Sequence, residues 1–153
     1  MEKPQQRIGK GSIKAFKIHS DTDIKIAKMI RHEVFVIGQH VPENEEIDNF
    51  ENNSYHFLAY YGDSPCGAAR WRFTENGIKL ERFAVLEKFR GMGVGSALVD
   101  VVLGDISNHP ETPGKMIYLH AQLSAIRLYS KFGFKKVGKI FQECEIDHYK
   151  MIR

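Results

Sequence analysis

Apolar and polar positions follow strand-like and helix-like periods in the first forty residues. From Ile13 to Ile18, lysines interrupt a run of apolar residues, which predicts a first strand. The Ser-Asp-Thr-Asp run at 20–23 then has the form of a helix cap with an acid at the third helical position. The helix is expected to reach about Val36, because apolar residues recur at helical spacing: Ile24, Ala27, Ile30 and Val34.

The middle of the chain predicts an acidic segment followed by three strands. Residues 42–53 are polar and acidic, and they are expected to form a short helix and then a loop. Strand candidates follow at Tyr55–Tyr61, Ala68–Phe73 and Ile78–Val85. The segments between them are rich in turn formers, and an Asn-Gly pair at 76–77 favours a hairpin. An antiparallel meander is therefore expected.

The last third of the chain predicts helices between strands. One helix is expected after a glycine-rich run, because one of its faces is apolar: Val94, Ala97, Leu98, Val101, Val102 and Ile106. A buried strand, a short helix and two closing strands are then expected at Met116–Ala121, Ser124–Phe132, Phe134–Val137 and Cys144–Ile152. The whole order of elements indicates one mixed α/β domain over 13–153, preceded by a flexible polar tail at 1–12.

Composition excludes several classes of protein. The chain has 153 residues, of which 42% are hydrophobic and 27% charged, so it can bury a core without disulfides. No apolar run is long enough for a membrane span, and no secretory signal is present, so a cytoplasmic protein without a membrane partner is expected. Cys66 and Cys144 have no metal-like spacing, and the histidines are scattered, so no metal is expected. A net charge of +3 gives no reason to expect nucleic-acid binding.

The run from Arg90 to Gly95 (Arg-Gly-Met-Gly-Val-Gly) joins a predicted strand to a predicted helix. Such a turn suits an anion, because glycines admit close backbone approach and the first helical N–H groups point at the ligand. A Walker loop would need a Lys-Ser or Lys-Thr pair, and a dinucleotide fingerprint would need a third glycine where Ser96 stands. Neither pattern fits. A tight strand-to-helix turn without a ligand is the simpler alternative.

The pattern [RQ]xxGx[GA] does fit, through Arg90, Gly93 and Gly95. The segment Ala125–Phe134 also fits A-x-x-x-Y-x-x-x-G-F, and the apolar strand 80–85 precedes the glycine run. On these residues the chain resembles the GNAT acetyltransferase superfamily over nearly its whole length. The resemblance implies a mostly antiparallel sheet of about seven strands, splayed between the fourth and fifth, with about four helices. It also implies acetyl-coenzyme A (acetyl-CoA) as the acetyl donor.

Within the superfamily, the sequence is similar to the ElaA-like and YjcF-like branch. The similarity lies in the segments 31–42, 67–72 and 80–82, in Glu46 and Asp48, and in the C-terminal residues Phe141, Glu143, Ile146, His148 and Met151. Gly38 departs from the branch, which commonly has a charged residue there. Residues 145–148 read Glu-Ile-Asp-His where Gly-Ile-Pro-His is usual. Because of this difference, the resemblance does not predict the shape of the acceptor-site wall.

The resemblance implies a donor site on the fourth strand and the following turn. The strand 83–85 would pair through its backbone with the pantetheine arm of acetyl-CoA, and Tyr129 would donate a proton to the departing thiolate. A core aromatic is the alternative for Tyr129. The residues expected to contact the cofactor are Phe83, Ala84, Val85, Arg90, Gly91, Met92, Gly93, Val94, Gly95, Ser96, Gln122, Tyr129 and Lys131.

The base that takes the proton of the amine is less well defined by the sequence. Glu81 is a candidate, because partial burial would raise its pKa towards neutrality. An ion pair with Arg70 or Arg72 on the neighbouring strand is the alternative. Strand alternation would place Glu81 on one face and its neighbours Leu80 and Arg82 on the other. His148 and Glu143 on the last strand, or a water, are further candidates.

The acceptor is expected to be a primary amine of a small molecule or peptide, which attacks acetyl-CoA directly in a ternary complex. Five acids at 43–51 could attract a cationic amine. The arginines at 31, 70 and 72 could instead bind a carboxylate or phosphate of the substrate. The residues expected to contact the substrate are Glu46, Asp48, Arg72 and His148. A coenzyme A-binding sensor or interaction module without catalysis is the alternative function, and a homodimer is an assembly to be tested.

Overall fold

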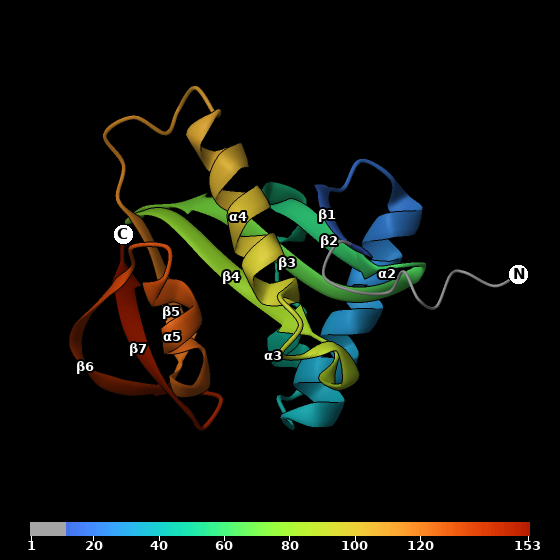
Figure 1. Ribbon diagram of the computed structural model, residues 1–153. Helices are drawn as coiled ribbons and strands as arrows, with labels where there is room; N and C mark the ends of the chain where they lie inside the picture. The colour runs from blue at the N-terminus through green and yellow to red at the C-terminus, as the bar shows by residue number, and fades with distance from the viewer. Residues whose placement is uncertain (1–11) are drawn as a thin grey trace, which may run out of the picture.

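The computed structural model describes residues 12–153, so the expected tail lies outside the described residues except for its last one. The strands form one sheet in the order β1-β2-β3-β4-β5-β7-β6 (Figure 1). All neighbouring strands are antiparallel except β4 and β5, which are parallel. The strands are β1 (Ile13–Lys17), β2 (Tyr55–Tyr61), β3 (Ser64–Thr74), β4 (Gly77–Val85), β5 (Ile117–Gln122), β6 (Lys135–Glu143) and β7 (Ile146–Ile152).

The sheet is splayed between β4 and β5, as the family resemblance implied. The two strands pair at only three positions, from Ile78 opposite Ile117 to Leu80 opposite Leu119. The remaining residues of β4 have no partner on β5, and the two strands diverge beyond these pairs (Figure 1). The opening leaves one edge of β4 unpaired in the middle of the sheet.

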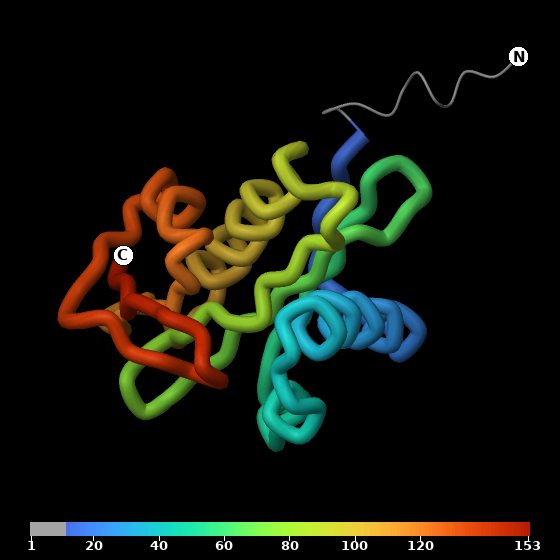
Figure 2. Tube along the Cα trace, turned by 90° about the horizontal axis from the view of Figure 1, so that it is seen from below, coloured from blue at the N-terminus to red at the C-terminus, as the bar shows by residue number. Residues whose placement is uncertain are grey.

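Helices cover both faces of the sheet, with α2 on one side and α4 on the other (Figure 2). A hydrogen bond from the backbone N–H of Asp23 to Ser20 Oγ, at 3.2 Å, confirms the predicted N-cap. The first helix has the predicted extent, but its C-terminal part is a π-helix. The helical elements are α2 (Asp21–Arg31), the π-helix η2 (His32–Gly38), α3 (Glu43–Glu46), α4 (Val94–Ser107) and α5 (Ile126–Ser130), with short 3-10 turns at Glu51–Asn53, Glu87–Phe89 and Leu123–Ala125. Within residues 12–153, none of these helices has the length and apolarity to cross a membrane.

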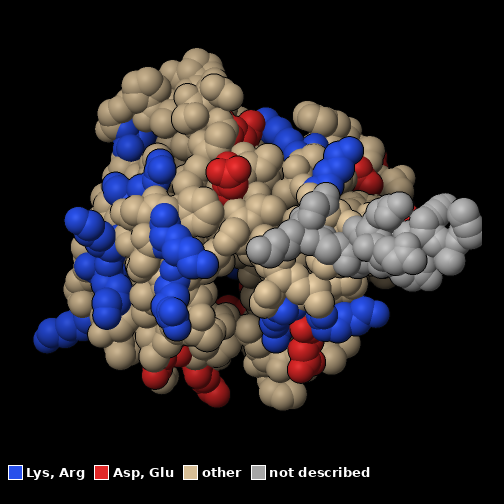
Figure 3. Space-filling view, viewed as in Figure 1, with Lys and Arg blue, Asp and Glu red and all other residues tan. Residues whose placement is uncertain are grey.

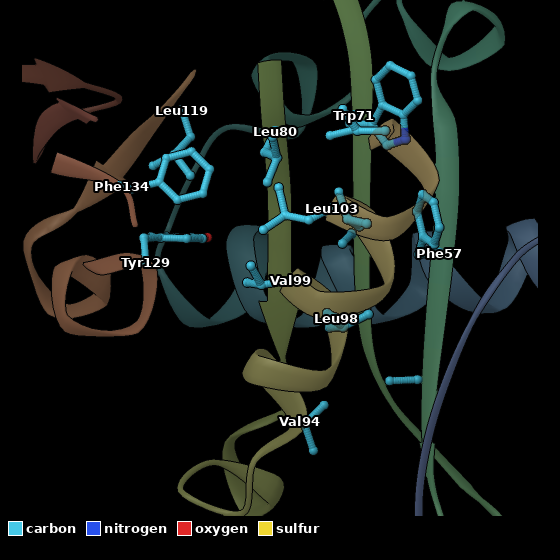
Figure 4. Close-up of a cluster of buried hydrophobic side chains, with 14 of the residues drawn as sticks. Phe57, Trp71, Leu80, Val94, Leu98, Val99, Leu103, Leu119, Tyr129 and Phe134 are labelled. Carbon is cyan, nitrogen blue, oxygen red and sulfur yellow. The ribbon is translucent and has the colours of Figure 1, made fainter. Parts of the chain in front are cut away.

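The main core lies between α4 and the sheet (Figure 4). Val99 and Leu103 are buried there with the predicted Leu98, whereas Ala97 and Val101 are only partly buried. The apolar face of α4 is thus rotated from its predicted position, because apolar residues occupy several sides of the helix. A smaller cluster packs α2 against the other face of the sheet, through Ala27, Ile30, Val34, Leu58 and Ala68 among others.

The last hairpin differs from its prediction. Its first strand continues to Glu143, and the second begins at Ile146, not at Cys144. Cys144 and Glu145 form the turn instead, with φ of 50° and 63°. Two-residue hairpin turns favour positive φ at both central positions, which normally selects Asn and Gly. Cys144 and Glu145 do not have this preference, so the turn could not be predicted from residue types.

Candidate active site

A cleft of about 720 Å³ occupies the opening between β4 and β5. Figure 3 shows the molecule hollowed at this place, between the half that carries β5–β7 and the half that carries β4. Its walls come from β4, β5, η2, the N-terminus of α4, α5 and the β6–β7 turn. Every residue predicted to contact the cofactor lines this cleft except Met92, whose side chain lies outside it and is 40% exposed. The structure therefore brings together segments that lie up to 48 residues apart in the sequence, from 83 to 131.

The unpaired edge of β4 presents main-chain groups to the cleft. The N–H of Leu86 donates to the carbonyl of Cys66 on β3, at 2.9 Å. Because successive residues of a strand direct their backbone groups to opposite sides, Phe83 and Val85 direct theirs away from β3. The Val85 carbonyl is accordingly bound by Arg90 Nε, at 2.9 Å. The backbone N–H groups of Phe83 and Val85 thus face the open edge, as a β-strand-like ligand would require.

The glycine turn needs its glycines. Gly91 and Gly93 have φ of 78° and 98°, a region that L-residues with side chains rarely adopt. Gly93 is the N-cap of α4, so the free N–H groups of the first helical turn point out of this end of the helix. A Cβ on Gly95 would lie only 3.2 Å from Leu128 of α5. The turn thus combines free N–H groups at a helix end with close packing against α5.

Tyr129 lies at the wall of the cleft, on α5. The residue is 93% buried, and its ring contacts Phe83 edge-on at 5.9 Å and Phe134 at 6.0 Å between ring centroids. Figure 4 shows its hydroxyl directed towards β4, and this hydroxyl has no hydrogen-bond partner within residues 12–153. Burial raises the pKa of Tyr129, so the phenol stays protonated at neutral pH. The group can therefore act as a proton donor.

Glu81 does not have the environment expected of a base. Its Oε2 accepts hydrogen bonds from Arg70 Nε at 2.8 Å and from Arg72 Nε at 2.7 Å. Its Oε1 lies 3.4 Å from the ammonium of Lys79. Burial acts to raise the pKa of Glu81, but the three cations outweigh it and hold that pKa below its ordinary value. The expected rise in pKa is therefore wrong, and the cross-strand ion pair is present.

Strand alternation also fails at Arg82. This residue has φ of 59°, and the pairing of β3 with β4 shifts register beside it. The bulge turns Arg82 to the same face as Glu81, where its guanidinium binds Asp48 at 3.1 Å and the backbone carbonyl of Glu46 at 3.2 Å. A β-bulge adds one residue to one strand, so the side chains beyond it change faces relative to simple alternation.

Three carboxylates of the acidic segment, those of Glu46, Asp48 and Glu51, bind a buried arginine cluster. Arg31 binds Glu46 at 2.6 Å and Glu51 at 2.7 Å. Arg70, which is fully buried, binds Glu51 at 2.7 Å and Asp48 at 2.6 Å. The arginines at 31 and 70 thus neutralise acids of the same chain and are not exposed to recognise a substrate anion.

The structure separates the four predicted substrate contacts. Glu46 and His148 line the cleft, whereas Asp48 and Arg72 do not. The Arg72 guanidinium stacks on the ring of Phe50, with 3.7 Å from its central carbon to the ring centroid. Only two of the four are therefore placed to contact a molecule in the cleft.

Two wall residues were not among the predicted contacts. His120 occupies an apolar strand and fits no motif. Gln39 belongs to the segment 31–42 that is similar to the branch, but its partner lies 83 residues away, so no local pattern indicated their contact. Gln39 and Gln122 exchange two side-chain hydrogen bonds, of 3.3 and 2.9 Å, which join η2 to β5. The amide of Gln122, a predicted cofactor contact, is thus occupied by another residue of the chain.

The comparisons with known proteins agree with this architecture. The family model of the acetyltransferase (GNAT) domain matches residues 16–153. The chain belongs to this family. It is 36% identical over 143 residues to the uncharacterized N-acetyltransferase YjcF of Bacillus subtilis, covering 92% of this chain and 99% of the relative.

Two solved structures of the same fold are informative. The crystal structure of Escherichia coli ElaA matches with a TM-score of 0.80 and 27% identity, over 92% of this chain and 99% of that one. Arabidopsis thaliana Naa50, in complex with the bisubstrate analogue CoA-Ac-MVNAL, matches with a TM-score of 0.68 and 26% identity, over 93% and 98% of the two chains. The resemblance to the superfamily and to the ElaA-like and YjcF-like branch is therefore confirmed.

Proposed function

We propose that this protein transfers the acetyl group of acetyl-CoA to a primary amine of a small molecule or peptide, by direct attack in a ternary complex. The observation that carries the proposal is the unpaired edge of β4, which runs from the glycine turn to Tyr129 inside one cleft. Family membership supports acetyl transfer. The analogue in the Naa50 complex joins coenzyme A to a peptide through an acetyl group, which supports both the donor and a ternary arrangement.

The residues at the donor end fit the chemistry of coenzyme A. Its pyrophosphate would be held by the first N–H groups of α4, whose dipole favours negative charge, and by the guanidinium of Arg90. Its pantetheine arm carries amides that can pair with the backbone N–H groups of Phe83 and Val85, like an added strand. Lys131, on the same wall, adds positive charge for phosphate.

The chain also offers groups that could stabilise the acetyl carbonyl and protonate the departing sulfur. A backbone N–H of the open β4 edge would donate to the carbonyl oxygen of the acetyl group, where negative charge develops. Tyr129 would give its proton to the sulfur as the carbon–sulfur bond breaks. Glu81 is bound to arginines and would have to leave those ion pairs to take a proton. Another residue of the cleft wall is therefore the better candidate for the base that deprotonates the amine.

A thiol-release assay over a panel of amines tests this function. The panel should span alkylamines, polyamines, amino acids and peptide N-termini, with acetyl-CoA binding followed by calorimetry. Tyr129→Phe is expected to lower kcat by about a hundredfold or more, with unchanged acetyl-CoA affinity. Tyr60→Phe is the matched control, because Tyr60 lies on β2 outside the cleft. Acetyl-CoA binding without turnover of any amine would instead support a coenzyme A-binding module.

A further inference from the structure

His120 lies at the point where the sheet opens. Leu80 and Leu119 form the last pair of β4 with β5, so Glu81 and His120 are the first residues beyond the split. Leu80 and Leu119 are buried in the core with α4. By alternation His120 therefore lies on the other face of the sheet, and it lines the cleft with 24% of its side chain exposed.

The hydrogen bond of His120 fixes its tautomer. Its Nδ1 lies 2.8 Å from Oε2 of Glu143 on β6. This hydrogen bond, more than any other contact, holds the pKa of Glu143 below its ordinary value, so the carboxylate is ionised and can only accept. In the neutral form of the imidazole, Nδ1 must then carry the proton and Nε2 keeps its lone pair. Nε2 has no hydrogen-bond partner among residues 12–153.

His148 faces the same carboxylate from β7. Its Nδ1 donates to the backbone carbonyl of Ile146 at 2.6 Å, and its Nε2 lies 3.8 Å from Glu143 Oε1. Phe141 contacts both imidazoles, edge-on to His120 at 5.0 Å and stacked with His148 at 5.8 Å. His148 is nearly fully buried, so His120 is the more accessible of the two imidazoles.

We propose that His120 is the base that accepts the proton of the attacking amine, and that Glu143 is the positioning residue that holds its ring and stabilises its charged form. This inference rests on the proposed acetyltransferase function. A carboxylate that binds Nδ1–H orients an imidazole and favours the imidazolium that forms when Nε2 takes a proton.

His120 and Tyr129 together account for every proton that the reaction transfers. The nitrogen of the neutral amine forms a bond to the acetyl carbon while the carbon–sulfur bond breaks. The surplus proton on nitrogen passes to Nε2 of His120, directly or through one water, and the sulfur takes the proton of Tyr129. The proton of His120 then returns to the Tyr129 oxygen through solvent. One amine and one thioester thus give one amide and one thiol.

Other charged groups face His120 and belong in any account of its pH dependence. Glu143 and His148 face it from β6 and β7, and Tyr118 contacts its ring at 6.0 Å on its own strand. Lys150 of β7 is its cross-strand partner, and Lys79 and Glu81 come from β4 beside the split. Glu81 and Lys79 bind one another, which leaves Glu143 as the carboxylate bound to the imidazole.

The test compares His120→Gln and Glu143→Gln in the full chain, using the best amine of the panel. His19→Gln and Glu145→Gln are matched controls, because both residues are exposed and lie outside the cleft. His120→Gln is expected to lower kcat at least a hundredfold and to remove the acid limb of the kcat/KM profile, with unchanged acetyl-CoA affinity. Glu143→Gln is expected to lower kcat at least tenfold and to shift that limb, and Glu143→Asp to recover part of the rate.

The outcomes separate the two proposals. An active wild type whose rate and acid limb survive His120→Gln would overturn the role of His120 and leave the acetyltransferase function standing. Loss of activity in His148→Gln with a normal His120→Gln would move the base to His148. A wild type that binds acetyl-CoA but acetylates no amine would overturn the proposed function and this inference with it.

Discussion

Arg70 and Glu81 face one another from neighbouring strands, and their ion pair lies beside the place where β4 leaves β5. Arg70 is fully buried, and its guanidinium also binds Asp48 and Glu51. One cation thus ties the acidic segment to the strand that lines the cleft. Since the bulge at Arg82 is held by the same acidic segment, this cluster positions the open edge of β4.

Removing Arg70 should be far more damaging than removing an exposed arginine. Arg70→Met leaves the carboxylates of Asp48, Glu51 and Glu81 without their shared partner, and loss of one member of a buried ion pair typically costs about 3–5 kcal/mol. Urea unfolding at constant m-value measures the change. Arg127→Met, an exposed change on α5, is the control. Equal midpoints for the two variants would contradict the structural role of the cluster.

The cluster also predicts acid sensitivity. Burial opposes the effect, but the hydrogen bond from Arg70 lowers the pKa of Asp48 to about 2, and Arg31 lowers the pKa of Glu51. A carboxylate whose pKa is lower in the folded than in the unfolded chain stabilises fully above its unfolded pKa of about 4. The free energy of unfolding should therefore fall as the pH drops from about 4 towards 2. Asp48→Asn should make the free energy of unfolding depend less steeply on pH in this range. Asp63→Asn, a change in an exposed turn, is the control. An equally steep pH dependence in the two variants would contradict the prediction.

A methyl group at Gly93 should weaken the donor site. Gly93→Ala forces a side chain into φ of 98° at the N-cap of α4, which moves the N–H groups proposed to bind pyrophosphate. Calorimetry should show an acetyl-CoA affinity reduced at least tenfold. Gly104→Ala, in the same helix with nothing near its Cβ, should bind normally and unfold at higher urea. Equal affinities in the two variants would remove the turn from the donor site.

The amide pair across the cleft should show energetic coupling. Gln39 and Gln122 bond to one another through both side-chain amide groups, so either single change to Ala leaves the other amide unpaired. The double variant should then lose less stability than the sum of the single variants, by about 1 kcal/mol. A urea double-mutant cycle measures this difference. Strict additivity would mean that the two amides do not depend on one another in solution.

The regular elements could be predicted because their patterns are local. The strand Tyr55–Tyr61 has its predicted bounds, and the helix after the glycine run spans Val94–Ser107, which includes its predicted apolar residues from Val94 to Ile106. The residues predicted to contact the cofactor were chosen from short motifs, a glycine turn and a tyrosine that each keep a fixed spacing within one segment, and all of them except Met92 line the cleft. These features depend on neighbours within about ten residues.

The features that were predicted wrongly or not at all depend on residues far away in the sequence. The pKa of Glu81 depends on arginines of the neighbouring strand, and the orientation of Arg82 depends on a bulge stabilised by an acid 34 residues away. His120 gave no signal because its partner Glu143 lies 23 residues further along the chain. Charge composition identified the acidic segment but could not show that Glu46, Asp48 and Glu51 bind buried arginines.

Because β4 separates from β5, the proposed donor and acceptor sides of the cleft should differ in how well they tolerate amino-acid substitutions. The groups proposed to hold the arm of the donor belong to the main chain, so a substitution at Phe83 or Val85 leaves the N–H and C=O groups in place. The acceptor wall depends on side chains such as His120 and Glu143, where a single substitution alters the chemistry. One donor site can therefore be kept through sequence drift while the wall opposite it is rebuilt for another amine.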